Sequence, residues 1–256
     1  MFSSLKGVKI EHDISIYTVL KQIICNMLTG KGNNIVIGPP FRPSKVLVFD
    51  VETTGLLPRQ DRTSSIVQLS NYPYITQASF VMYDLSQQKI VQTYDSYIKL
   101  PDHVVISDET TQITGITKDI CQKQGCDITV FLENMYKAYS EADVLVAHNF
   151  EFDEKMIMIE LERNRKYILE TNPECLGLFN RASEELRNIE RCCTMKKGTD
   201  ICNIMIESNI AGRPPRKKWP RLAELYTKLF DEPAPDGLHN SLVDVTATLK
   251  CYLKLR

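Results

Sequence analysis

Two carboxylates, Asp50 and Glu52, lie two positions apart at the end of an otherwise apolar segment that begins at Lys45. Side chains at positions i and i+2 of an extended strand point to the same face, so the two carboxylates would converge while Phe49 and Val51 turn toward a core. Two like charges this close repel each other unless a cation lies between them. Hard oxygen ligands of this kind suit Mg²⁺ or Mn²⁺. The pair therefore predicts part of a metal site.

A site for two metal ions usually needs about three or four carboxylates, so further acidic residues are required. Asp153 follows the apolar run 144–147 and stands near the start of a predicted helix, a location that suits a ligand at the carboxyl end of a strand. Asp244 falls in the first turns of the last predicted helix, and His239 stands just before that helix. Taken singly, each carboxylate could be a helix cap or a solvated surface charge. Their order and surroundings favour one shared site.

The composition is that of a globular protein without a strong electrostatic preference. The chain has 256 residues, of which 43% are hydrophobic and 25% charged, and its net charge is −1. This length fits one large domain, or a domain with an appendage, that can bury a core without disulfides. Because the net charge is near zero, nucleic-acid binding would depend on a local basic patch or on bridging metal ions.

The cysteines and the lack of long apolar runs favour an intracellular, soluble protein, either cytoplasmic or nuclear. The chain has eight cysteines, none in a Cys-x-x-Cys pair, and no secretory signal is recognisable at its start. Reduced thiols are therefore expected rather than disulfides or a structural zinc site. No apolar run approaches the ~20 residues of a membrane span, so no membrane association is expected.

Residues 1–44 are expected to form a helical extension followed by a connector. Asp13 can cap a helix whose apolar residues recur with helical spacing, and Gly30 is a plausible stop. The stretch 30–43 is rich in glycine, asparagine and proline, as connectors are. The helix could fold back onto the main domain or dock a partner protein.

From residue 45 onward the pattern predicts strands first and helices later. Strands are expected to begin at residue 45 and to cover 75–85, 90–100 and 144–147. Helices are expected over 129–140, 153–163, 222–230 and 242–253. Residues 170–212 have no clear periodicity, and short helices covering one side are expected there. This order predicts an α/β fold with a mixed sheet and helices on its faces.

Three ordered segments, 49–56, 146–153 and 239–244, resemble the sequence motifs of the DEDDh (DnaQ-like) 3′–5′ exonucleases. This family includes the proofreading epsilon subunit of bacterial DNA polymerase III. Residues 113–117 are a weaker match, because Thr114 stands where many members have histidine. The resemblance covers roughly residues 45–255. It does not cover residues 1–44, and the segment 165–212 is longer than in a minimal member.

The resemblance implies a fold and a metal-dependent chemistry. The fold would be a ribonuclease-H-like mixed five-stranded sheet flanked by helices, in a domain of residues 45–256 with an insertion around 165–212. Two Mg²⁺ or Mn²⁺ ions would bind the site and support hydrolysis that releases nucleoside 5′-monophosphates from a nucleic-acid 3′ end, single-stranded or frayed. His239 would act as the general base, a role that imidazole suits at neutral pH. The implied metal ligands are Asp50, Glu52, Asp153 and Asp244.

Substrate contacts are expected near the first motif and in one basic segment. By resemblance, Thr53, Thr54 and Gly55 approach the terminal nucleotide, although a plain strand-to-loop turn is the alternative. Asn149 could contact substrate, orient the second motif or cap the loop. The segment 213–221 contains five positive charges and one tryptophan. Its residues Arg216 and Lys217 could follow the phosphate backbone, or the segment could be a solvated face.

Three functions remain open from the sequence. The catalytic motifs are shared by DNA-degrading and RNA-trimming enzymes, so they do not select between the two substrates. A non-catalytic adaptor for a polymerase complex, bound through the N-terminal helix, would keep the same fold. The intact carboxylate set with His239 argues against the adaptor, because charges that repel without metal have no use there.

Overall fold

A computed structural model describes residues 44–58, 68–207 and 214–256 of the chain. The helix and connector expected within residues 1–43 lie outside the described residues, so the N-terminal helical extension stays a prediction. Among the described helices, none combines the length and the apolar character that crossing a membrane would require.

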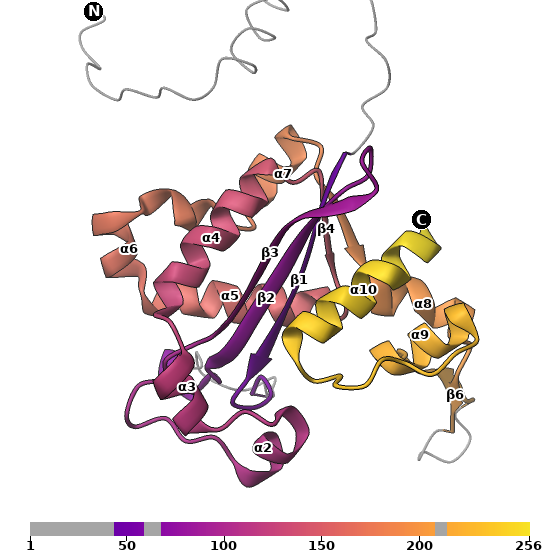
Figure 1. Ribbon diagram of the computed structural model, residues 1–256, viewed down its shortest axis with the longest axis horizontal. Coiled ribbons are helices and arrows are strands. Elements are labelled where there is room, and N and C mark those ends of the chain that lie inside the picture. Colours follow the sequence, from indigo (N-terminus) through magenta and orange to yellow (C-terminus); the bar gives the residue numbers. More distant parts are fainter. Residues whose placement is uncertain (1–43, 59–67, 208–213) are drawn as a thin grey trace, which may run out of the picture. The chain divides into compact units, whose positions relative to one another are not determined.

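The described domain is built on a mixed five-stranded sheet with the strand order β3-β2-β1-β4-β5 (Figure 1). β1 pairs antiparallel with β2, and β2 pairs antiparallel with β3, because a turn of four residues joins them. β4 and β5 run parallel to β1, since helical segments connect them. The strands are β1 (Lys45–Thr53), β2 (Ile75–Asp84), β3 (Lys89–Tyr97), β4 (Val144–Ala147) and β5 (Glu190–Cys193). The predicted mixed five-stranded sheet is confirmed.

Helices cover both faces of this sheet and its lower end as drawn in Figure 1. The helices are α2 (Asp108–Thr114), α3 (Lys118–Gln124), α4 (Ile128–Glu141), α5 (Phe150–Arg163), α6 (Arg165–Thr171), α7 (Arg181–Leu186), α8 (Thr194–Cys202), α9 (Leu222–Phe230) and α10 (Ser241–Leu255). Two short 3₁₀ turns, η1 (Leu69–Asn71) and η2 (Pro173–Gly177), and a small hairpin of β6 (Met205–Ile206) and β7 (Arg216–Lys217) complete the described part.

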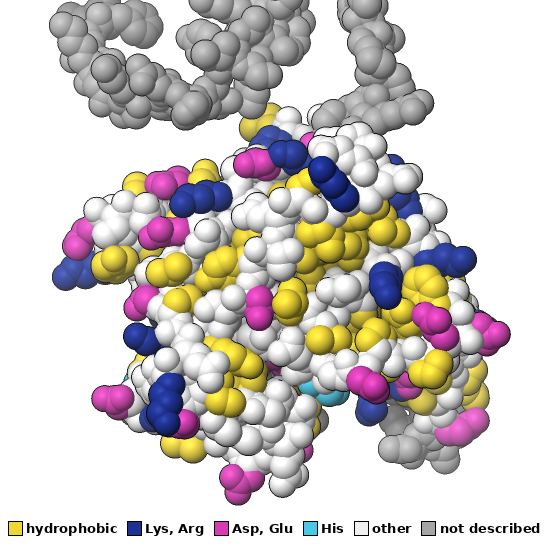
Figure 2. Space-filling model, in the orientation of Figure 1, with side chains coloured by type: hydrophobic (Ala, Val, Ile, Leu, Met, Phe, Trp, Pro, Cys, Tyr) yellow, Lys and Arg dark blue, Asp and Glu magenta, His cyan; other side chains and the backbone are white. Residues whose placement is uncertain are grey.

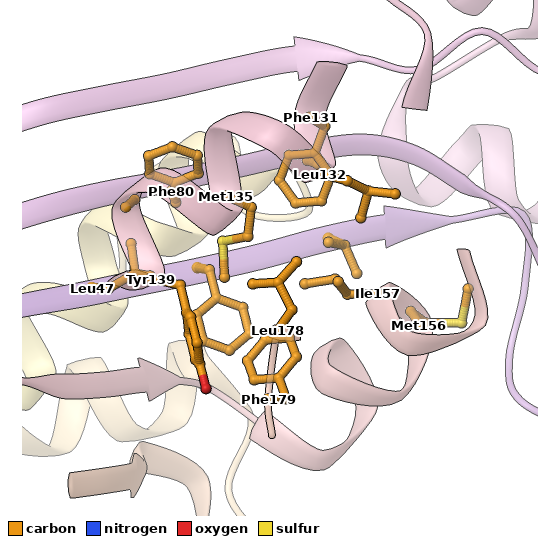
Figure 3. Close-up of a cluster of buried hydrophobic side chains, with 14 of the residues drawn as sticks. Leu47, Phe80, Phe131, Leu132, Met135, Tyr139, Met156, Ile157, Leu178 and Phe179 are labelled. Carbon is orange, nitrogen blue, oxygen red and sulfur yellow. The ribbon is translucent and has the colours of Figure 1, made fainter. Parts of the chain in front are cut away.

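One face of the sheet packs against α4 and α5 in the main hydrophobic core (Figure 3). Leu47, Phe49 and Val51 of β1 all belong to this core, as the alternation of the strand predicts. The Phe49 ring meets the Phe150 ring edge-on, with a centroid separation of 5.2 Å. This contact fixes the first turn of α5 against β1.

The opposite face of the sheet packs against α10. Val46 and Val48 of β1 form a second core with Val245 and Leu249 of α10. Asp50 and Glu52 continue the same alternation, so they belong to the face that α10 covers. Near the end of β1 this face therefore changes from apolar to acidic.

Several parts of the chain differ from the sequence-based expectation, and two of them lie beside the site or in the central sheet. α5 begins at Phe150, three residues before the expected start, because Asn149 adopts a left-handed conformation (φ 69°) that turns the chain directly into the helix. β5 lies in a segment where only short helices were expected. Its four residues, Glu190–Cys193, have no apolar alternation, and pairing with β4 defines the strand.

The surface carries charges of both signs. On the face shown in Figure 2, basic and acidic side chains are interspersed over the helices. This distribution agrees with the net charge of −1 and directs attention to local features of the site rather than to a general basic surface.

Candidate active site

The end of β1 and the first turn of α5 bring three carboxylates together. Asp50 and Glu52 project from β1, and Asp153 lies in the first turn of α5, where it is 2% exposed. An oxygen of the Asp153 carboxylate (Oδ1) accepts a hydrogen bond of 3.1 Å from the backbone N–H of Val51, the residue between the other two acids. The α5 carboxylate is thereby fixed directly beside the β1 pair.

The start of α10 adds a fourth carboxylate and an imidazole. One potential ligand atom from each of Glu52, His239 and Asp244 lies within 4.8 Å of the other two. The backbone N–H of His239 points at both carboxylate oxygens of Asp244, at 3.4 and 3.3 Å. His239 adopts a left-handed backbone (φ 71°), a conformation rare for a residue with a side chain, and it is exposed. The structure thus brings Glu52, His239 and Asp244 into one group of possible ligands. Asp153 lies at Val51 beside this group, and Asp50 is close enough to feel the charges of Glu52, Asp153 and Asp244.

The carboxylates disfavour one another's charged forms. Burial and then the charges of Asp153, Asp244 and Glu52 raise the pKa of Asp50 well above its ordinary value. Burial and the charge of Asp244 raise the pKa of Glu52 to about 8. Burial raises the pKa of Asp244 to about 6, and it also raises the pKa of Asp153.

A bound cation would balance the negative charge of such a group and relieve the repulsion between its carboxylates. The four implied ligands are carboxylates, and carboxylate oxygens are the donors that Mg²⁺ and Mn²⁺ favour. The residues present therefore fit the divalent cations that the sequence motifs imply.

His148, which lies within the second motif, has a structural environment. Its Nδ1 lies 2.9 Å from the Thr194 hydroxyl, and its Nε2 lies 3.1 Å from the carbonyl oxygen of Pro220. Burial lowers the pKa of this imidazole to about 4, so the ring is neutral at physiological pH. His148 joins the end of β4 to α8 and to the segment before α9.

The three residues after Glu52 form a tight turn with an open side. The Thr53 hydroxyl donates to the carbonyl oxygen of Gly55 at 2.7 Å, and the Thr54 hydroxyl accepts from the backbone N–H of Tyr74 at 3.0 Å. Each hydroxyl therefore makes one hydrogen bond within the protein. A Cβ added at Gly55 would meet no atom within 4 Å, so space beside this backbone is available to a ligand.

Leu56 is a candidate that the sequence reasoning did not identify. Its side chain is 86% exposed although it directly follows Gly55 beside the acidic group. An isolated exposed leucine is common on protein surfaces, but one at the rim of a polar site can contact an apolar part of a ligand. Its place at the end of the first motif is the signal in the sequence that could have identified it.

Arg163 holds the segment 69–74 in place, and this segment is hydrogen-bonded to the turn at Thr54. Its guanidinium donates to the carbonyl oxygens of Leu69, Tyr72 and Pro73, at 3.0, 2.6 and 2.9 Å. It also lies 3.6 Å from the centre of the Tyr74 ring. The backbone of Tyr74 in turn accepts a hydrogen bond of 2.9 Å from the N–H of Thr54. Arg163 thus supports the turn beside the carboxylates indirectly, through residues 69–74.

Replacing Arg163 by alanine is expected to lower the free energy of unfolding by about 3–5 kcal/mol, because it leaves the buried carboxylate of Glu160 without its partner. The two groups form an ion pair of 2.6 Å with side chains 10% and 4% exposed. Arg165→Ala is a matched control, since Arg165 and Glu162 form an exposed pair with the same sequence spacing. That variant should change stability by less than about 1 kcal/mol. Urea unfolding measures both, and equal losses would contradict the expectation.

The other residues proposed to contact substrate, Asn149, Arg216 and Lys217, lie in two different parts of the fold. Asn149 directly precedes α5, and its side chain makes no hydrogen bond to the helix start, so its amide is not used as a cap. Arg216 and Lys217 are exposed on the β6–β7 hairpin, where Lys217 forms an ion pair of 2.6 Å with Asp200. The structure does not place these two basic residues within the carboxylate group.

Comparison with known proteins identifies the family of the chain. Residues 47–252 match the sequence model of the RNase_T exonucleases, which spans all three motifs. The chain therefore belongs to this exonuclease family.

Individual relatives extend this result. The chain is 32% identical over 116 residues to the PolC-type DNA polymerase III of Listeria welshimeri, an alignment that covers 45% of this chain and 7% of the polymerase. Escherichia coli exonuclease I in complex with a dA16 oligonucleotide superposes with a TM-score of 0.55 at 18% identity, over 83% of this chain and 40% of that one. The nuclease domain of 3′hExo, a DEDDh family member bound to rAMP, gives a TM-score of 0.56 at 13% identity, over 83% and 92%. The two structural matches show the shared fold.

Proposed function

We propose that the protein is a metal-dependent 3′–5′ exonuclease that hydrolyses the terminal phosphodiester bond of a nucleic acid and releases nucleoside 5′-monophosphates. The observation that carries the proposal is the convergence of Glu52, His239 and Asp244 within 4.8 Å, beside the fixed carboxylate of Asp153. Membership of the exonuclease family supports the same reaction.

Four carboxylates from three elements of the fold would bind two divalent cations. When bound, such cations neutralise charge on a reacting phosphate and acidify an attacking water. The residues themselves hold fixed positions: Asp50 and Glu52 on the rigid central strand, Asp153 by its bond to Val51. This rigidity keeps the ligands ready for the reaction and limits their reorganisation.

His239 would take the proton from the attacking water. Its side chain is exposed at the mouth of the acidic group, and its backbone is anchored to the Asp244 carboxylate. An exposed imidazole can pass its proton on to solvent, as repeated turnover requires. The start of α10 would therefore position the base, and transfer of its proton to bulk water would regenerate it.

The terminal nucleotide would lie along Gly55 and Leu56. The open space at Gly55 admits close approach of the substrate backbone, and the exposed Leu56 side chain offers an apolar contact for a base. Neither contact depends on the identity of the sugar. Exonuclease I was solved with DNA and 3′hExo with rAMP, so both DNA and RNA 3′ ends are candidate substrates here.

A gel assay tests the proposal directly. DNA and RNA labelled at the 5′ end, single- and double-stranded, are incubated with Mg²⁺, with Mn²⁺ or with EDTA. The proposal expects progressive shortening from the 3′ end that EDTA stops and that His239→Ala slows by ~10²–10⁴-fold. The preferred substrate appears in the same experiment. Absence of shortening on every substrate would contradict the proposal and favour a non-catalytic adaptor.

Gly55→Ala is expected to weaken substrate binding without affecting stability. The added methyl group meets no protein atom within 4 Å, so the melting temperature should stay within ~1 °C of the wild type. If a nucleotide fills that space, KM should rise by ~10-fold, the cost of about 1.4 kcal/mol of lost contact. Steady-state kinetics with a fixed oligonucleotide and thermal unfolding measure the two effects. An unchanged KM would remove Gly55 from the substrate site.

A further inference from the structure

A row of polar side chains crosses the sheet beside the acidic pair. In the antiparallel ladder Ser79 lies opposite Asp50, and Gln77 lies opposite Glu52. On the next strand, Asp95 lies opposite Ser79. Opposite residues of an antiparallel pair project to the same face, so the row shares the α10 face with the two carboxylates. Gln77 and Ser79 are 1% and 0% exposed, which makes unpaired polar atoms costly there.

The hydrogen bonds of this row have a defined direction. The Ser79 hydroxyl donates to Oδ1 of Asp95 at 2.6 Å. Since a hydroxyl has one hydrogen, Ser79 must accept in its 2.5 Å contact with the Ser241 hydroxyl, and Ser241 donates. A second route runs through Gln77: its amide nitrogen donates to the same Asp95 oxygen at 2.9 Å. Its amide oxygen accepts from the backbone N–H of Ser241 at 3.3 Å.

Both routes end on the first residue of α10. The N–H of Ser241 has no partner within its own helix, and Gln77 supplies one. His239 precedes Ser241 by two residues, and Asp244 follows it by three. The start of α10 is thus bound to the two residues of β2 that lie opposite Asp50 and Glu52. One hydrogen-bonded unit therefore connects the two halves of the acidic site.

We propose that Gln77, Ser79 and Asp95 are positioning residues that hold His239 and Asp244 in register with the carboxylates of β1. This inference rests on the proposed function and extends it to residues outside the three motifs. The three residues act through Ser241 and not by touching a cation. Loss of such supporting hydrogen bonds typically lowers metal affinity or activity by ~10–100-fold.

Three variants break or preserve the row, and a fourth is a matched control. Ser79→Ala removes the link between Asp95 and Ser241, and Asp95→Ala removes the acceptor that Ser79 and Gln77 share. Asp95→Asn keeps an oxygen that can accept. Ser96→Ala removes a hydroxyl from the same strand on the opposite face, where it donates to the Tyr97 carbonyl at 2.8 Å.

The full chain and each variant are compared by calorimetric titration with Mn²⁺, by kcat and KM on a single-stranded oligonucleotide, and by melting temperature. Ser79→Ala and Asp95→Ala are expected to lower Mn²⁺ affinity and kcat by ~10-fold or more, with KM within about twofold. Asp95→Asn should recover most of the loss, and Ser96→Ala should change neither quantity.

The inference is overturned if Ser79→Ala and Asp95→Ala remain folded with Mn²⁺ affinity and kcat equal to those of Ser96→Ala. A wild-type chain that binds Mn²⁺ but cleaves nothing would contradict the proposed function alone, and the titration would still decide this inference. A wild-type chain that binds no Mn²⁺ would overturn both.

Discussion

Asp153→Asn is expected to reduce nuclease activity by at least ~10³-fold, equivalent to about 4 kcal/mol of lost transition-state stabilisation. Asparagine has nearly the same shape, and its side-chain oxygen can still accept the hydrogen bond from the Val51 N–H. The substitution therefore removes a negative charge and leaves the local structure in place. Since burial and neighbouring charges raise the pKa of Asp153, the metal-free variant should be at least as stable as the wild type.

Glu151→Gln is the matched control for Asp153→Asn. Glu151 lies in the same first turn of α5, but it is exposed and forms a surface ion pair of 2.6 Å with Lys196. Its replacement should leave activity within about twofold, because surface pairs contribute at most about 1 kcal/mol. Activity is measured as the initial rate of 3′ shortening, and Mn²⁺ affinity by calorimetric titration. If Asp153→Asn kept more than a tenth of wild-type activity with normal Mn²⁺ affinity, Asp153 would not be a metal ligand.

The strands β1 and β4 could be predicted because their signals are local. The alternation in β1 places Phe49 in the core and Asp50 on the other face, and the apolar run of β4 needs no tertiary information. β5 could not be placed in this way. Glu190–Cys193 carries no apolar pattern and becomes a strand only through pairing with β4.

The residues of the motifs were identified from the sequence, whereas their supporting contacts were not. Ser79 and Ser241 are 162 positions apart, and their 2.5 Å contact follows from strand register and from the packing of α10. Serine and glutamine on a strand give no local signal of such a role. The same holds for Arg163, whose contacts with residues 69–74 depend on tertiary structure. Sequence patterns therefore indicate candidate residues for the chemistry more readily than the residues that position them.

The metal-free protein is expected to lose stability as the pH rises from about 5 to 8. Burial raises the pKa of Glu52 from 4.5 to about 8, and that of Asp244 from 3.8 to about 6. The folded state therefore binds these protons more tightly than the unfolded state. Their contribution to stability is complete below pH 3.8 and 4.5, and is lost as the pH passes about 6 for Asp244 and about 8 for Glu52. The total loss should be of the order of a few kcal/mol.

Under the proposed function, divalent cations should reverse this loss, because they would bind the deprotonated carboxylates. At a free cation concentration 100 times its Kd, binding adds about 2.7 kcal/mol of stability. The gain in melting temperature on adding Mg²⁺ or Mn²⁺ should therefore be larger at pH 8 than at pH 5, and EDTA should abolish it.

Glu52→Gln removes one of the titrating charges and supplies the comparison. Its metal-free stability should fall less between pH 6 and 8, and its response to cations should be weak. If the stability of wild type and variant changed with pH in the same way, and both responded equally to Mn²⁺, Glu52 would be neither a carboxylate with a raised pKa nor a metal ligand.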